Sequence, residues 1–408
     1  MDILIRNISS LVQTTAGTET VAGQKMGETP SVSNAFLYIR NGLIHSFGPD
    51  EQAPDVTCEV IDATGRLVLP GFIDCHTHLI FPSTRENEFV MKIKGASYAD
   101  IAAAGGGILN SAAALKRMSE DELFEKSLSR VHEIIKSGTV AVEIKSGYGL
   151  DTEQEIKMLR VARRLGGVAG IPVKTTFLGA HAVPVGVSKS DYITMIKNEM
   201  IPAVASEKLA DFIDVFCEQG FFSPDESLDV LTTGKKYGMI PRIHANQLSR
   251  SGGVQTAVKA GAVSADHLEQ MESEDIELLK AGSVMPVALP GAAFFLRLPY
   301  TPAREIIRHG LPVTIASDYN PGSSPSGNMM FMWSLACIGM RMTPEEALNA
   351  MTINPAFVLG LSHSHGSVHP GKSGSVIITR PFSSLACLPY HYAMPAIEKV
   401  IVAGRPVF

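Results

Sequence analysis

The segment GFIDCHTHL, residues 71–79, is an apolar run that ends in two histidines separated by one residue. In a β-strand, residues i and i+2 point to the same face, so the imidazoles of His76 and His78 can reach one metal ion. The spacing alone is weak evidence, because His363 and His365 repeat it in SHSHG, which is typical of a polar loop. We interpret that second pair as surface histidines. The meaning of the first pair depends on its surroundings.

Seven further runs share the design of this segment. Each is rich in Val, Ile or Ala, ends in polar or glycine residues, and is followed by a segment with helical spacing such as 151–166 or 224–238. The eight runs are VLPGFIDCH (68–76), TVAVEIKSGYG (139–149), VKTTFLGAH (173–181), FIDVFCE (212–218), IPRIHAN (240–246), AVSADHLE (262–269), VMPVALPG (284–291) and PVTIASDYNPG (312–322). This alternation predicts an α/β fold with a (β/α)8 TIM-like barrel.

The two ends of the chain do not follow the alternation. Residues 1–67 and 365–408 contain short alternating runs with turns, for example AFLYIRNGLIHSFG and EKVIVAGRPVF. We expect them to meet as one small β-sandwich beside a barrel formed by residues 68–364.

Composition narrows the possible partners and the location. The 408 residues carry a formal net charge of -6, and no Lys/Arg-rich run suits a phosphate backbone, so we expect no nucleic-acid partner. The N-terminal run alternates like a strand, and no apolar run has spanning length, so we expect a cytoplasmic protein without a membrane partner. Five scattered cysteines favour reduced thiols over a disulfide framework.

Four residues at three strand ends together predict a metal site. In a (β/α)8 barrel the carboxyl ends of the strands converge on one mouth, which brings His76 and His78 near His244 and Asp318. Three imidazoles and a carboxylate suit one Zn²⁺ or Fe²⁺/Fe³⁺ ion per chain. Such an ion activates water and polarises a carbonyl, so hydrolysis of a cyclic amide becomes feasible. The fourth run ends in Glu218 without a lysine, which argues against a carbamate-bridged pair of metals.

The ends of the sixth and eighth runs supply candidate catalytic groups. His267 ends the sixth run and could bond the reacting carbonyl or orient the attacking water. Asp318 could collect the proton and return it to the leaving nitrogen. These alternatives remain open at this point.

Several long motifs give the chain a family resemblance. It resembles the amidohydrolase superfamily and, within it, the imidazolonepropionase family. The motifs that carry this resemblance are LPGFIDCHTHLIF, STRENEF, AGGGILNS, VEIKSGYGLD, FLGAHAVP, IHANQLSRSGG, SADHLE, LPGAAFFLR and SDYNPGSSPSGNM. The resemblance implies that 4-imidazolone-5-propanoate and water give N-formimidoyl-L-glutamate in histidine degradation. It also implies a homodimer.

The same resemblance implies substrate contacts at matching positions. Arg85 is similar to the family's anchor for the propionate carboxylate, a group with which arginine can form a bidentate pair. Tyr148 and His181 are similar to residues that hold the substrate ring. Taken singly, each is more often a solvated loop cation or a buried, hydrogen-bonded side chain.

The loop after the eighth run and the residues after His244 complete the implied site. Asn320, Gly322 and Ser323 resemble the loop that contacts the product, although a simple Asn-Pro-Gly turn is the alternative. Many relatives carry Asp and Glu at the positions of Asn246 and Gln247. We include Gln247 among the catalytic and substrate-binding residues, but it cannot accept a proton. The base should therefore be Asp318 or His267, or both.

Two other functions compete with this hypothesis. A deaminase of a guanine-like nucleobase would share the metal ligands, but a neutral base would not need the cation of Arg85. A catalytically inactive amidohydrolase-like scaffold would be expected to lose ligand histidines, all of which are present here.

Overall fold

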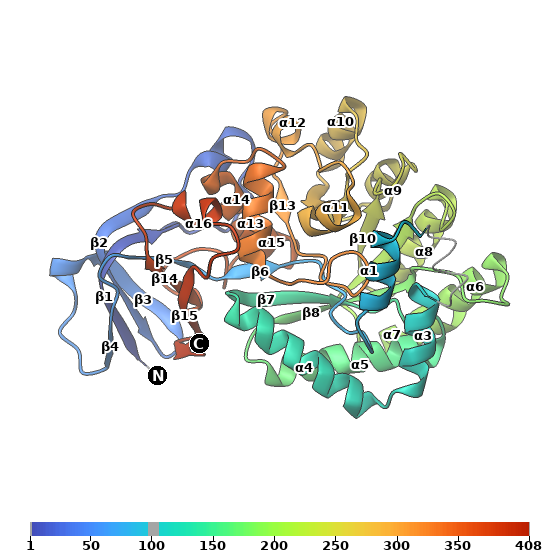
Figure 1. Cartoon of the computed structure of the whole chain (residues 1–408), viewed down its shortest axis with the longest axis horizontal. Helices are drawn as coiled ribbons and strands as arrows, with labels where there is room; N and C mark the ends of the chain where they lie inside the picture. The colour runs from blue at the N-terminus through green and yellow to red at the C-terminus, as the bar shows by residue number, and fades with distance from the viewer. Residues whose placement is uncertain (1, 97–105, 408) are drawn as a thin grey trace.

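The computed structural model describes residues 2–96 and 106–407. Its centre is a barrel of eight parallel strands that follow one another in chain order (Figure 1). The strands are β6 (Phe72–Asp74), β7 (Thr139–Lys145), β8 (Val173–Ala180), β9 (Phe212–Cys217), β10 (Ile240–Ala245), β11 (Ser264–His267), β12 (Met285–Ala288) and β13 (Thr314–Ile315). Each lies within one of the eight apolar runs, so the predicted barrel is confirmed.

The barrel closes between the segments that follow β6 and β13. The backbone N–H of Asp318 donates to the carbonyl of His76 over 3.0 Å, and that of His78 donates to the carbonyl of Tyr319 over 2.9 Å. The closing hydrogen bonds therefore use the backbone of predicted site residues.

The helices between the strands begin where the sequence supplies caps. α5 (Thr152–Val168) follows Asp151, whose carboxylate accepts a backbone N–H of the first turn. α8 (Pro224–Lys236) begins with a capping box between Ser223 and Glu226. The other barrel-segment helices are α1 (Glu86–Ile93), α3 (Ile108–Arg117), α4 (Glu120–Lys136), α6 (Lys189–Met195), the π-helix η3 (Ile196–Met200), α7 (Ile201–Ser206), α9 (Gly253–Ala260), α10 (Ser273–Gly282), α11 (Pro290–Leu296), α12 (Ala303–Arg308), α13 (Met329–Ile338), α14 (Pro344–Met351) and α15 (Ile353–Val358).

A second, mixed sheet is built from both ends of the chain and lies beside the barrel (Figure 1). Its strands run in the order β16-β15-β14-β5-β1-β2-β3, and β4 also pairs with β1. Their bounds are β1 (Ile3–Val12), β2 (Ser31–Arg40), β3 (Leu43–Pro49), β4 (Glu59–Asp62), β5 (Arg66–Pro70), β14 (Val376–Pro381), β15 (Ile397–Val402) and β16 (Arg405–Pro406), with η1 (Gly23–Gly27), η2 (Asp50–Gln52) and α16 (Cys387–Tyr390) between them. The two chain ends meet as predicted, and the domain limits stay a prediction.

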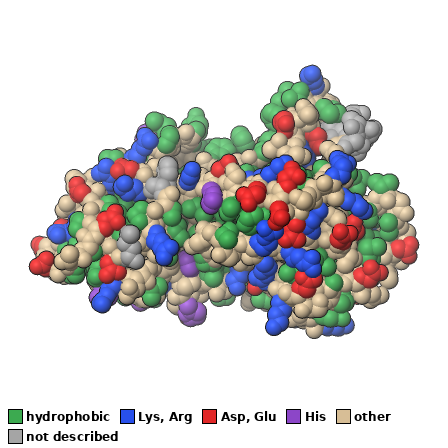
Figure 2. All heavy atoms as spheres, turned by 90° about the horizontal axis from the view of Figure 1, so that it is seen from below, with side chains coloured by type: hydrophobic (Ala, Val, Ile, Leu, Met, Phe, Trp, Pro, Cys, Tyr) green, Lys and Arg blue, Asp and Glu red, His purple; other side chains and the backbone are tan. Residues whose placement is uncertain are grey.

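Packing and surface agree with a large buried core. The Trp333 ring of α13 is fully buried and meets the Phe72 ring of β6 edge-on, with ring centroids 6.0 Å apart. All five cysteines are free thiols. On the face in Figure 2, acidic and basic side chains are interspersed. Among the described residues, no helix combines the length and apolar character needed to cross a membrane.

Candidate active site

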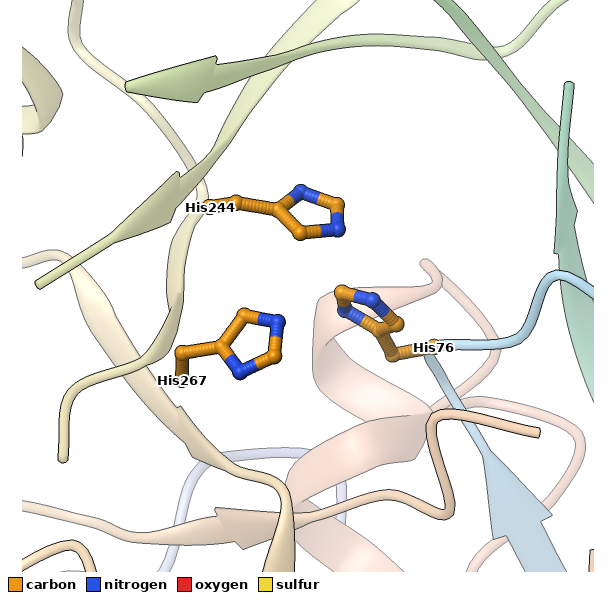
Figure 3. A group of neighbouring side chains, drawn as sticks. All are labelled: His76, His244 and His267. Atoms are coloured by element: carbon orange, nitrogen blue, oxygen red, sulfur yellow. The ribbon is translucent and has the colours of Figure 1, made fainter. Parts of the chain in front are cut away.

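Four predicted ligands converge at the mouth of the barrel. The Nε2 atom of His78 lies 3.3 Å from Nε2 of His76 and 3.4 Å from Nε2 of His244. Oδ1 of Asp318 lies 3.5 Å from Nε2 of both His76 and His78. Figure 3 shows the rings of His76, His244 and His267 turned toward one another. The four predicted ligands and His267 all have buried side chains.

These distances fit a small cation. Four donors placed tetrahedrally about 2.1 Å from a central ion lie about 3.4 Å from one another. Burial lowers the pKa of His76 and of His78 well below the ordinary value, so both imidazoles are neutral, as metal ligands must be. His267 also lies close enough to His76 and His244 to form an overlapping group of possible ligands.

Carboxylates behind two of the histidines hold their rings in place. Nδ1 of His76 lies 2.6 Å from Oδ2 of Asp266, so the ring donates this N–H and leaves Nε2 free to face the mouth. Nδ1 of His244 lies 3.1 Å from Oδ2 of Asp214. Arg242 in turn donates to Asp266 over 2.7 Å. The arrangement is typical of a metal centre with a supporting second layer.

Buried charges inside the barrel support these carboxylates and were missed in the sequence. Nζ of Lys145 lies 3.0 Å from Glu143 and 2.9 Å from Asp214, and all three side chains are fully buried. Arg242 is buried with them and lies 3.7 Å from Glu143. Charged residues at alternate positions of the apolar runs VEIK, FIDVF and IPRIH were the available signal, because such residues in a strand share the face of the neighbouring ligands.

His267 and Asp318, the predicted acid–base residues, both have shifted pKa values. Burial raises the pKa of Asp318 to about 7, although the nearby His267 opposes this effect. Burial lowers the pKa of His267, but the neighbouring carboxylates of Glu269, Asp318 and Asp266 together raise it to a value above the ordinary one. Groups tuned in this way are suited to giving and taking protons near neutral pH.

A cavity of about 450 Å³ opens above the donor set and collects the predicted substrate contacts. Arg85 lines it, donates through Nε and Nη2 to the hydroxyl of Ser111, and lies 5.6 Å from the ring centroid of Tyr148. His181 stacks on His78, with ring centroids 5.4 Å apart and planes 21° apart. The same cavity therefore contains predicted metal ligands and the Arg85 guanidinium.

The loop after β13 lines the same cavity. The Asn320 side chain accepts the backbone N–H groups of Gly322 and Ser323, each over 2.8 Å, and donates to the carbonyl of Asp318 over 2.7 Å. The turn proposed as the alternative for this motif is therefore present within the cavity wall. Gln247 also lines the cavity, and its side chain has no hydrogen bond to another residue in the described ranges.

A buried carboxylate shapes the turn that carries Tyr148. Glu155 accepts the backbone N–H groups of Gly147, Gly149 and Leu150 at 2.7–3.0 Å. A side chain at Gly149 would place its Cβ 2.3 Å from the backbone nitrogen of Glu155, so only glycine fits this close approach. The SGYG motif is therefore needed to bring Tyr148 to the cavity.

Two other sequence features lie apart from the donor set. His363 is exposed, and His365 bonds the hydroxyl of Ser364 over 2.8 Å. Glu218, at the end of β9, accepts the backbone N–H groups of Leu248 and Ser249. Glu218 therefore orders the loop after β10.

Comparisons with known proteins agree with this geometry. The model of the amidohydrolase family matches residues 67–407. The chain therefore belongs to the amidohydrolase family, whose members include metal-dependent hydrolases, and specifically to its imidazolonepropionase branch, as its curated relatives indicate.

Two relatives and one solved structure illustrate the match. The imidazolonepropionase of Flavobacterium johnsoniae is 49% identical over 99% of this chain and 100% of its own length. That of Geobacillus kaustophilus is 41% identical over 99% and 97%. The zinc-bound crystal structure of an adenosine deaminase from Xanthomonas campestris shares the fold, with a TM-score of 0.70 and 16% identity over 99% of this chain and 92% of its own. The family resemblance drawn from the motifs is confirmed.

Asp266→Asn tests whether the carboxylate behind His76 supports metal binding. We expect the affinity for Zn²⁺ to fall about 10- to 100-fold, because the amide is a weaker acceptor for the ring N–H. Competition with a chromophoric chelator measures the affinity, and thermal unfolding of the metal-free protein reports damage to the fold. Lower stability with unchanged affinity would contradict the supporting role.

Proposed function

We propose that this chain hydrolyses 4-imidazolone-5-propanoate to N-formimidoyl-L-glutamate in histidine degradation. The observation that carries the proposal is one cavity that is lined by three of the four predicted metal ligands and also by the cation of Arg85. No salt bridge joins Arg85 to a carboxylate in the part of the chain that the structure describes. The names of the curated relatives support the same reaction.

The proposed roles follow from position in the cavity. Arg85 binds the propionate carboxylate of the substrate, which a bidentate guanidinium contact suits. Tyr148 and His181 flank the imidazolone ring between this anchor and the donor set. Gln247, whose amide both donates and accepts, bonds the ring without taking its proton.

We assign one Zn²⁺ or iron ion to His76, His78, His244 and Asp318. When bound, the ion supplies Lewis-acid activation of water and of the substrate carbonyl. In the reaction the water oxygen bonds to the ring carbonyl carbon, and the C–N bond breaks. Asp318 takes a proton from the water and returns it to the leaving nitrogen, while His267 orients the water or the carbonyl.

A direct assay separates this function from nucleobase deamination. We expect turnover of freshly prepared 4-imidazolone-5-propanoate by the metal-loaded protein and none of guanine or cytosine, because Arg85 selects a carboxylate. Ultraviolet absorbance follows the imidazolone, and released ammonia reports deamination. Activity on a nucleobase alone would contradict the proposal, and a lack of bound metal would favour the inactive scaffold.

Arg85→Ala tests the carboxylate anchor. Loss of a charge-assisted hydrogen bond predicts a KM about 10- to 100-fold higher, with a smaller change in kcat. Lys94→Ala is the matched control. Arg85 directly precedes α1, and Lys94 is an exposed cation that directly follows the same helix. Steady-state kinetics of both variants measures the effect. Equal KM values for the two variants would rule out the anchor.

Asp318→Asn tests the proton-transfer role. We expect kcat to fall about 10²- to 10⁴-fold, as is usual when a general base is removed. Metal content, measured on the same preparation, separates loss of the ion from loss of the base. An unchanged kcat with full metal content would refute the role.

The homodimer and the cytoplasmic location stay predictions. Sedimentation of the purified protein tests the first of them.

A further inference from the structure

The backbone turns sharply at His267. His267 and Leu268 both have left-handed backbone angles, with φ of +85° and +65°. Non-glycine residues rarely adopt this region, and its use at a site points to a functional constraint. The hydroxyl of Thr301 donates to the carbonyl of His267 over 2.6 Å and holds the turn. One consequence is that Glu269 folds back beneath the His267 ring.

Glu269 is buried in an unusual way. Its side chain is fully buried, and its Oε1 lies 3.3 Å from Nδ1 of His267. Its Oε2 has no hydrogen-bond partner among the residues described. Within those residues, no Lys or Arg forms a salt bridge with it. Burying a carboxylate against a single histidine is costly.

Two other buried glutamates near the mouth show what a structural carboxylate does here. Glu155 accepts three backbone N–H groups, and Glu218 accepts the backbone N–H groups of Leu248 and Ser249 and a hydroxyl. Both hold loops. Glu269 holds no loop within the described residues, because its side chain contacts only the ring of His267 there.

We propose that Glu269 is the positioning residue of His267. It accepts the Nδ1–H of the ring and fixes the ring plane against the cavity wall. In the neutral ring, this contact leaves Nε2 as the acceptor that faces the cavity. An acceptor at this place orients the attacking water through one of its O–H groups. This assignment favours the water over the carbonyl as the partner of His267, and it rests on the proposed hydrolysis.

His267 contacts the rings of two neighbouring histidines, but these contacts do not fix which of its ring nitrogens faces the cavity. Its ring centroid lies 5.2 Å from that of His244 and 5.7 Å from that of His76, and the three rings converge in Figure 3. Without the Glu269 contact, the ring can rotate about its side-chain bonds and exchange the positions of its two nitrogens. Rotation would misplace the acceptor but leave the four donors of the metal site untouched.

Three substitutions at Glu269 separate the hydrogen bond from charge and packing. Glu269→Leu removes the acceptor, and we expect kcat to fall about 10- to 100-fold with little change in KM or metal content. Glu269→Gln keeps an acceptor at the same length without the charge and should retain most of kcat. Glu269→Asp keeps the charge but withdraws the acceptor, and it should resemble the leucine variant. The last two variants decide the matter even if the leucine variant does not fold.

A double-mutant cycle links the effect to His267. In a His267→Ala background, Glu269→Leu should lower kcat no further, because the ring that it positions is gone. Asp275→Asn is the control for a buried carboxylate, since Asp275 bonds Arg250 in the same β11–α10 unit. It should change stability without changing kcat.

The outcomes distinguish this inference from the proposed function. A wild-type protein that does not hydrolyse imidazolonepropionate would remove the proposed function. If the wild type is active, three results would overturn the role of Glu269. They are an unchanged kcat in Glu269→Leu, additive effects of Glu269→Leu and His267→Ala, and a kcat of Glu269→Gln as low as that of Glu269→Leu.

Discussion

The hydrogen bonds that close the barrel determine the rest of the structure. The first and last strands are joined by the backbones of His76, His78, Asp318 and Tyr319. The contact that completes the cylinder therefore also brings a histidine pair from one end of the barrel segment to a carboxylate from the other. A metal site built from these predicted ligands would lie where the barrel closes and would not depend on a loop that folds over it. The fold and the donor set depend on the same few peptide groups.

A second constraint acts inside the barrel. Lys145 and Arg242 are buried with Glu143, Asp214 and Asp266, where a hydrophobic core of equal volume would often be at least as stable. Their place in the site accounts for their burial, because Asp214 and Asp266 lie directly behind the imidazoles of two predicted ligands, His244 and His76. The charges thus contribute ligand orientation, and the two cations form ion pairs with the carboxylates in the buried interior.

The sequence predicts the parts of the site that depend on strand order. A histidine or aspartate at the end of an apolar run must reach the barrel mouth, so His76, His244 and Asp318 could be chosen from their positions alone. Asp214 and Lys145 left only a weak signal, their alternation with apolar residues, which does not tell whether a charged side chain faces a ligand or another layer. The role of Glu269 was still harder to predict from the sequence, because its contact with His267 depends on backbone angles that no composition pattern encodes.

Left-handed backbone angles occur at three residues near the barrel mouth, and their strain is a cost that the fold must offset. Asn246, His267 and Asp318 each follow or end a strand with left-handed φ of +53°, +85° and +54°. Such residues cost about 1–3 kcal/mol each, except that Asn accepts the region more readily. A closed barrel with a buried core can carry this cost, because each of these residues ends or follows a strand that is anchored in the sheet. At His267 and Asp318, the left-handed backbone belongs to residues whose side chains line the cavity.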